Sequence, residues 1–390
     1  MAEIVYTKNY SAGEHQSEVE LRAEGSDELI KELAMKAISV LKEDPKTEKT
    51  VQITQPERLG DMEHDVVAIY DNAGIPSFMH RFRKITNKEL FGGSDKTHPA
   101  FIIGDEEYDE IYISVYENTM INGKPYSLPY QKPVTNITIE DFAKACFSKG
   151  EGWHCITAAE WGLLANLSLK NGTLPHGNTN SGKYHADKSE EGKTYGEYGK
   201  TLTGSGPETW THDHTPTGVH DLCGNIWEFC RGMRIKDGVL YSAKDNDAAL
   251  PETDLSENGK DWHEIRDDNG RTLRVSVDDD ENEITITCDT EYSEGYCGCE
   301  WQEVSADSPS EQMKELAFYA GEPEAYCWID SRDGEWILFR GGGWNDGAYA
   351  GVFYSNLDIA RSYSDAGIGG RSAYFKKHRT PVTDSQNAER

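Results

Sequence analysis

The loop sequence THDHTPTGVHD, residues 211–221, holds three histidines and two aspartates within a short stretch. Imidazole nitrogens and carboxylate oxygens together are typical ligands of transition metals such as iron or zinc. The candidate ligands are His212, Asp213, His214, His220 and Asp221. Their spacing matches no strong metal signature, and loop histidines beside Thr and Asp are usually solvated or hydrogen-bonded. A metal-dependent enzyme is therefore an alternative interpretation, and we assign no catalytic or metal-binding residue.

Two other groups of side chains could hold a cation. Cys297 and Cys299, together with Cys288 and Cys327, offer four thiols, but zinc knuckles usually place two residues between paired cysteines, and here there is one. The acidic runs EEYDE and DDDENE are typical of solvated faces, with a structural calcium ion as the alternative. We therefore predict no cofactor. Cys223 and Cys230 are expected to be small buried apolar residues.

Composition limits the class of protein and of partner. The chain has 390 residues, enough for two or three domains, and its 36% apolar residues, 20 Tyr and 9 Trp indicate a globular protein. A formal net charge of -30 disfavours nucleic acid and anionic membranes as partners. The start of the chain shows no secretory signal pattern, and no apolar window is long enough to predict membrane insertion.

The first part of the chain predicts a small attachment domain of α+β type, residues 1–64. The alternating stretch 17–23 predicts a strand, and Ser26 can cap a helix over 27–44 with one apolar stripe. A charged, proline-containing connector follows. The main domain is predicted to span 65–375 and to begin with strand candidates at 66–71 and 101–118.

Two helices are predicted in the main domain by their capping residues. The first begins after Thr138 and stops at Gly150, and the second begins with a capping box of Thr157 and Glu160 and ends near Gly172. Residues 172–221 show no periodicity and predict a long loop system. Further expected features are an acidic insert over about 236–330 with strands at 271–277 and 283–289 and a helix at 311–320, and a polar tail at 376–390.

Two separated motifs are typical of a tightly built scaffold. One is GNIWEF, in which Gly224 and Asn225 permit a tight turn, Trp227 and Phe229 bury apolar area, and Glu228 can hold backbone N–H groups of a loop. The other is the closing segment, which begins RGGGW at 340–344 and ends GRS at 370–372. Arg340 and Arg371 could clamp carboxylates or carbonyls in a bidentate manner.

In this order and spacing the motifs resemble the formylglycine-generating-enzyme type of C-type lectin fold, an α+β fold. Over about 97–375, with the segments GWHCITAAEW and LKNGTLPHGN adding to the match, the chain is similar to variable proteins of diversity-generating retroelements. The resemblance does not extend to formylglycine generation, because that chemistry needs paired cysteines in the C-terminal segment, and residues 328–390 contain none.

The resemblance explains the unusual composition of residues 340–375, which contain no Lys, Glu, Gln or Met. In that family a reverse transcriptase miscopies adenines of a template rich in AAY codons, which yields Asn, Asp, Ser, Gly, Ala, Tyr and Ile but never those four residues or Trp. Trp344 is therefore expected to be a constant position. By register with the family, the variable, ligand-binding positions within 340–373 are Gly343, Asn345, Asp346, Tyr349, Tyr354, Asn356, Asp358, Ile359, Tyr363, Asp365, Ala366, Gly367 and Gly370. The constant framework is Val352, Phe353, Leu357, Ala360, Ile368 and Arg371, with the apolar members anchored in the core.

The mixture of residue types also suits a binding surface, since Tyr gives broad contact at low entropy cost while Gly, Ser, Asn and Asp adapt their hydrogen bonding. We expect Tyr349, Tyr354 and Tyr363 to contribute most to binding. The resemblance implies a receptor-binding protein, in particular a phage tail-fibre tip that recognises a protein or glycan on a bacterial surface. Location in the virion tail and a homotrimer are expected, and a surface-associated or fixed adhesin is the alternative.

Overall fold

The computed structural model describes residues 2–12, 15–25, 66–306, 310–318 and 325–377. At the start of the chain, β1 (Ala2–Ala12) and β2 (His15–Gly25) form an antiparallel hairpin. The strand predicted at 17–23 lies within β2, whereas the helix predicted at 27–44 and most of the polar tail lie outside the described residues. None of the described helices is long and apolar enough to cross a membrane.

A five-stranded sheet forms one side of the main body, in the order β10-β24-β7-β4-β3. Its strands are β3 (Val66–Tyr70), β4 (Pro76–Arg83), β7 (Glu110–Ser114), β10 (Trp153–Cys155) and β24 (Ser372–Tyr374). The strand predicted at 66–71 is confirmed by β3. The stretch 101–118 was predicted as one strand, which is wrong, because Gly104 and Asp105 take positive φ and turn the chain between short strands.

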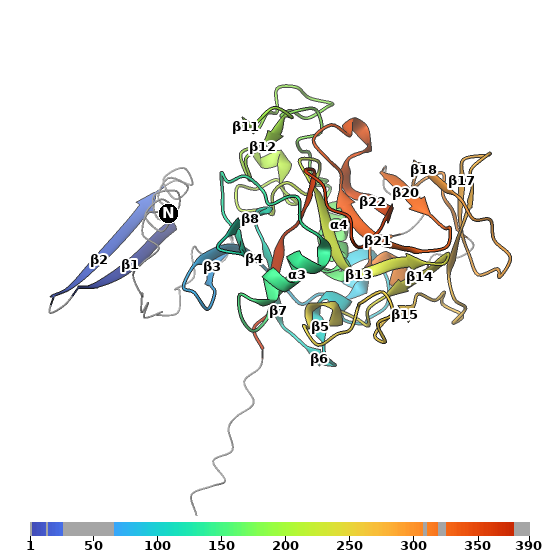
Figure 1. Cartoon of the computed structure of the whole chain (residues 1–390), viewed down its shortest axis with the longest axis horizontal. Coiled ribbons are helices and arrows are strands. Elements are labelled where there is room, and N and C mark those ends of the chain that lie inside the picture. Colours follow the sequence, from blue (N-terminus) through green and yellow to red (C-terminus); the bar gives the residue numbers. More distant parts are fainter. Residues whose placement is uncertain (1, 13–14, 26–65, 307–309, 319–324, 378–390) are drawn as a thin grey trace, which may run out of the picture.

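A larger sheet contains eleven strands among the described residues, in the order β18-β20-β22-β21-β13-β14-β16-β17-β19, with β15 beside β14 and β23 beside β13. Figure 1 shows β18, β20 and β22 together on one flank of the body. The bounds are β13 (Trp227–Lys236), β14 (Val239–Ser242), β15 (His263–Glu264), β16 (Arg274–Asp278), β17 (Glu283–Thr287), β18 (Tyr296–Glu300), β19 (Ser305–Ala306), β20 (Tyr326–Asp330), β21 (Glu335–Gly341), β22 (Gly351–Ile359) and β23 (Ile368–Gly369).

Short strand pairs and helices complete the description. The pairs are β5 (Ile102–Ile103) with β6 (Glu106–Glu107), β8 (Asn118–Ile121) with β9 (Lys124–Ser127), and β11 (Thr194–Tyr195) with β12 (Lys200–Thr201). The α-helices are α2 (Asn87–Phe91), α3 (Ile139–Phe147), α4 (Ala158–Asn171) and α5 (Glu311–Glu315). The 3-10 helices are η1 (Pro99–Phe101), η2 (Glu208–Trp210), η3 (Asp247–Ala249) and η4 (Gly347–Tyr349). The predicted α+β class is confirmed.

The two helices of the main domain begin where their capping residues predict. Thr157 and Glu160 form the expected capping box of α4, and Gly172 closes it in the left-handed conformation at φ 67°. Thr138 caps α3 through the Asp141 N–H. This helix ends at Phe147 with Ser148 as its C-cap, so the stop predicted at Gly150 is two residues too late.

The acidic stretch 236–330 is built into the large sheet. The predicted strands at 271–277 and 283–289 are confirmed by β16 and β17, and the predicted helix is shorter, Glu311–Glu315. The sequence interpretation missed β18 and β20, and these two strands place the stretch directly beside β22. This arrangement makes it a neighbour of the C-terminal segment.

Candidate ligand-binding surface

The C-terminal segment passes through both sheets. It leaves the end of β21 at Arg340, forms η4, crosses the large sheet as β22, pairs with β13 as β23 and ends in the five-stranded sheet as β24. Strand β22 is hydrogen-bonded to β20 on one side and to β21 on the other. The segment is therefore held by neighbours along most of its length.

Arg340 fixes the start of the segment by binding backbone carbonyls. Its guanidinium is fully buried and donates to the carbonyls of Leu316 at 2.6 Å and Ala317 at 3.1 Å, and to the hydroxyl of Ser355 at 2.5 Å. Burial lowers the pKa of Arg340 to about 10, so the group is still charged at neutral pH. Of the two kinds of partner predicted for this clamp, carboxylates or carbonyls, Arg340 binds carbonyls.

Arg371 fixes the end of the segment through a carboxylate. Its Nε donates to Glu228 Oε2 at 2.8 Å, and a terminal guanidinium nitrogen bonds the other oxygen of that carboxylate. Two backbone carbonyls, those of Ser114 at 3.2 Å and His220 at 3.0 Å, accept the remaining N–H groups. Arg371 and Glu228 are both fully buried. Their ion pair joins β13 to the end of the segment.

The role predicted for Glu228, holding backbone N–H groups of a loop, is wrong. Glu117 does that work: its carboxylate accepts from the Ile226 N–H at 3.3 Å and from the Asn225 side-chain amide at 2.6 Å. Two guanidinium nitrogens of Arg371 occupy the Glu228 carboxylate instead. Asn225 is scaffold as predicted, with φ 62° and a side chain that also accepts from the Thr201 N–H at 2.8 Å.

The other scaffold residues lie close to the segment. Phe229 is buried against Phe339, whereas Trp227, expected to be buried as well, is half-buried and packs on Tyr354 with ring centroids 4.5 Å apart. Trp344 is half-buried above Gly367, where a Cβ would come within 2.7 Å of its ring.

The buried carboxyl of Asp221 makes the stability of the folded protein depend on pH. One of its oxygens accepts from the Gly204 N–H at 2.8 Å, the other has no hydrogen-bond partner among the described residues, and burial raises the pKa of Asp221 to about 6. A raised carboxyl pKa means that the folded state holds its proton more tightly than the unfolded chain. This contribution to stability is complete below the usual pKa near 3.8 and is lost as pH rises through about 6.

We expect Asp221→Asn to remove this loss. Asn tolerates the positive φ of 62° and can still accept from Gly204. The difference in free energy of unfolding, variant minus parent, should increase by about 1 to 3 kcal/mol between pH 4 and 7 and then stay level. Urea unfolding at several pH values measures it. An equal difference at both ends of that range would contradict the assignment.

The predicted variable positions divide into three groups by exposure. The exposed positions are Asn345, Tyr349, Tyr363 and Asp365. The half-buried positions are Asp346, Asp358, Ile359 and Ala366. The buried positions are Gly343, Tyr354, Asn356, Gly367 and Gly370.

For the buried positions, the expectation that they face solvent is wrong. Tyr354 is only 3% exposed because it packs between Trp227 and Tyr326. Two of the three buried glycines lie where a side chain would collide with a ring: Gly367 under Trp344 and Gly370 against Phe142. Asn356 is 8% exposed within the central strand β22. These residues lie beneath the exposed part of the segment and pack against its neighbours.

The apolar residues predicted to form a constant framework are buried as expected, with one exception. Val352, Phe353, Leu357 and Ile368 are buried, in agreement with their expected anchoring role. Ala360 is exposed, so its assignment to the core is wrong, and the reason is that β22 ends at Ile359 and the chain turns outward. The exposed part of the segment therefore lies in η4 and in the loop 360–366.

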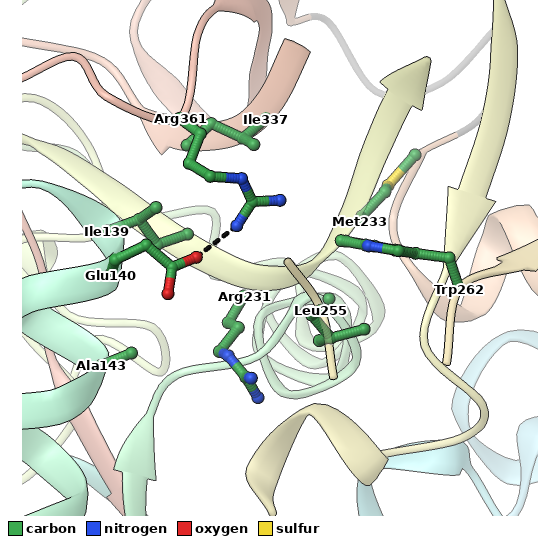
Figure 2. Close-up of a pocket in the computed structure, with 10 residues that line it drawn as sticks. Ile139, Glu140, Ala143, Arg231, Met233, Leu255, Trp262, Ile337 and Arg361 are labelled. Atoms are coloured by element: carbon green, nitrogen blue, oxygen red, sulfur yellow. Dashed lines mark hydrogen bonds and ion pairs between the residues drawn. The ribbon is translucent and has the colours of Figure 1, made fainter. Parts of the chain in front are cut away.

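Two side chains that the sequence analysis did not single out hold this loop. Lys200 donates to the Ala366 carbonyl and places its ammonium 5.3 Å from the centre of the Trp344 ring. Arg361 binds Glu335 through two nitrogens, at 2.7 and 2.8 Å, and binds Glu140 of α3. Figure 2 shows Arg361 reaching across a pocket toward Glu140, with the Arg231 side chain in the same pocket. Ionic contacts thus tie the loop to the body.

The three histidines proposed as metal ligands do not converge. His214 lies against His176 and the carbonyl of Leu174, and His220 stacks on Tyr116 with centroids 5.3 Å apart. Among the described residues, the group close enough to share a metal ion is instead His80, His212 and Asp213.

That group does not fit a metal well, because its donor atoms already have partners. His212 Nδ1 accepts from the Val219 N–H at 2.9 Å, and Asp213 Oδ1 accepts from the Thr215 N–H at 3.1 Å and hydroxyl at 2.9 Å. His80 Nδ1 lies 3.0 Å from the Thr217 carbonyl. Burial lowers the pKa of His212 to about 3, so the ring is neutral at physiological pH. This hydrogen-bonded network accounts for the group as a structural element.

The cysteines and acidic runs also have structural surroundings. Cys223 and Cys230 are buried as predicted, and burial raises the pKa of both thiols. Cys299 faces Cys327 across two strands, while Cys288 lies 3.6 Å from Asp267, so the four thiols considered for zinc do not share one site. In the DDDENE run, carboxylate oxygens accept backbone N–H groups of the neighbouring turn and of Tyr296.

No family model matches the chain, and no curated protein matches it in sequence. Two solved structures match the chain over most of its length. Treponema denticola variable protein 1 has a TM-score of 0.31 and 12% identity, over 79% of this chain and 98% of that protein. Major Tropism Determinant P3c Variant has a TM-score of 0.29 and 12% identity, over 76% of this chain and 62% of that protein.

Both neighbours are variable proteins of diversity-generating retroelements. This is the class that the sequence resembles.

Proposed function

We propose that the chain is a ligand-binding protein whose C-terminal segment displays exchangeable side chains on a fixed frame. The observation that carries the proposal is the placement of two buried arginines, Arg340 and Arg371, at the two ends of the segment. Between them, Asn345, Tyr349, Tyr363 and Asp365 are exposed. A frame held this firmly at both ends can accept changes at its exposed positions without losing its fold.

We further propose that the chain is a receptor-binding protein of a phage tail fibre, diversified by a retroelement, with a protein or glycan of the bacterial surface as its ligand. Residues 1–64 would attach it to the fibre, with a homotrimer as the assembly, and 65–375 would form the lectin-type domain. The residue types of 340–375 support diversification, since they match those that adenine miscopying can reach. A surface-associated adhesin is the alternative.

The gene locus tests diversification directly. We expect a nearby reverse-transcriptase gene, a template repeat that matches the codons of about 340–373, and differences between isolates at adenine positions. A locus that lacks all three features would contradict diversification. In that case a fixed adhesin on the same frame becomes the better interpretation.

The exposed tyrosines are expected to contribute most of the direct binding energy. Tyr349 is 51% exposed and Tyr363 is 45% exposed. In a clone that binds one strain of a bacterial panel, Tyr349→Ala and Tyr363→Ala should each weaken binding by about 1 to 3 kcal/mol, with little change in thermal stability. The matched control is Tyr198→Ala, an exposed tyrosine outside the segment. Unchanged binding in both segment variants would refute the proposed surface.

A further inference from the structure

Alternate residues of β18, β20 and β22 face the same side of the large sheet. The ladder sets Trp328 of β20 opposite Gly298 of β18 on one side and opposite Asn356 of β22 on the other. Side chains two residues apart along a strand point the same way. This face therefore also carries Tyr296, Glu300, Tyr326, Asp330, Tyr354 and Asp358. The intervening side chains, such as Cys299, Cys327 and Leu357, belong to the core.

Aromatic rings form a continuous path over this face. Tyr296 stacks on Trp328 with centroids 5.3 Å apart, and Trp328 is followed by Tyr326 at 5.9 Å. Tyr326 contacts Tyr349 of the C-terminal segment at 4.3 Å. A Cβ at Gly298 would come within 2.6 Å of Trp328, so the absence of a side chain lets this ring lie over the strand. The path links β18 to η4 and ends in exposed tyrosines at both sides.

The surroundings of this path are negatively charged. Asp358 interacts with Tyr296, yet its Oδ1 has no hydrogen-bond partner among the described residues, and burial raises the pKa of the Asp358 carboxyl. The nearby guanidinium of Arg332 lies over Tyr296 and is paired with Asp330. The formal net charge of the chain is -30. A cation would therefore be attracted to the carboxylate of Asp358, which is half-buried beside Tyr296.

We propose that the path Tyr296, Trp328, Tyr326 and Tyr349, together with Asp358, binds a lysine or arginine side chain of a protein ligand. Aromatic faces attract cations through the negative potential above the ring, and a poorly hydrated carboxylate gains more from a cation than an exposed one does. The inference rests on the proposed function, because it assigns a ligand class to the same surface. It also adds three aromatic residues that lie outside the C-terminal segment.

The test uses the whole chain and defined probes: tetralysine, tetraglutamate and the neutral sugar maltotetraose, titrated by tryptophan fluorescence at low and at high salt. We expect tetralysine to bind, more weakly at high salt, and Asp358→Asn and Trp328→Ala to weaken it by about tenfold each. The control Glu252→Gln removes one exposed negative charge elsewhere and should leave binding unchanged. Thermal unfolding identifies any variant that has lost its fold. If Trp328→Ala does not fold, Asp358→Asn still tests the site.

Three outcomes would overturn the inference. They are binding of maltotetraose without tetralysine, an equal loss in Glu252→Gln, and no binding of tetralysine. If the panel experiment still shows that Tyr349→Ala and Tyr363→Ala abolish recognition, the ligand-binding function stands and only the cationic class is wrong. If those variants bind as before while tetralysine binds, the proposed function fails and the cation site remains.

Discussion

Replacing Arg371 with methionine is expected to lower the free energy of unfolding by about 3 to 5 kcal/mol. The change leaves the carboxylate of Glu228 fully buried without its counter-ion, and leaves the carbonyls of Ser114 and His220 without their donor. Loss of one member of a buried ion pair is costly because the remaining charge keeps its desolvation penalty. Urea unfolding followed by circular dichroism measures the effect.

Two comparisons show whether burial of the charge is the cause. Lys88→Met breaks an ion pair with Asp95 in which both side chains are exposed, by 62% and 83%, and should cost only about 0 to 1 kcal/mol. Adding Glu228→Gln to Arg371→Met should restore part of the lost stability, because it removes the unpaired charge. A double variant as unstable as the sum of the two single variants would contradict this explanation.

Replacing Arg340 with methionine is expected to lower the free energy of unfolding by about 2 to 5 kcal/mol. The side chain is fully buried and bridges the carbonyls of Leu316 and Ala317 to β22 through Ser355. Arg340→Lys should recover only a small part, since one ammonium cannot reproduce the planar fork of donors.

The matched control for Arg340 is Arg266→Met. Arg266 also donates to a backbone carbonyl, that of Gly270 at 2.8 Å, but its side chain is 55% exposed, so water can replace it. We expect a change within about 0.5 kcal/mol for this variant. If Arg266→Met were as destabilising as Arg340→Met, the buried carbonyl clamp would not explain the effect. Thermal and urea unfolding of the three variants provide the comparison.

The sequence predicted the parts of the fold that depend on local signals. Helix α4 carries a capping box at Thr157 and a glycine stop at Gly172, and both act within one turn of the chain. For Arg340 and Arg371 the sequence left carboxylates and carbonyls open as partners, and the structure shows Arg340 on carbonyls and Arg371 on a carboxylate as well as carbonyls. Glu228 was assigned the wrong partner, since the choice between a backbone loop and Arg371 is made by contacts distant in sequence.

The composition of residues 340–375 indicated a display segment but not which positions are exposed. Tyr354 and Tyr363 are the same residue type, yet one lies inside an aromatic stack of β22 and the other in the loop after it. The strands β18 and β20 were missed, although Tyr326, Trp328 and Ile329 are residue types that favour strands. Their position beside β22 depends on sheet order, which periodicity alone cannot give.

The central position of β22, between β20 and β21, has a consequence for how ligands are selected. A segment that is already ordered before it meets a ligand loses little conformational entropy on binding. Different clones would then present different side chains on the same ordered backbone. Differences in affinity between clones would come from the contacts of those side chains and would appear mainly in dissociation rates.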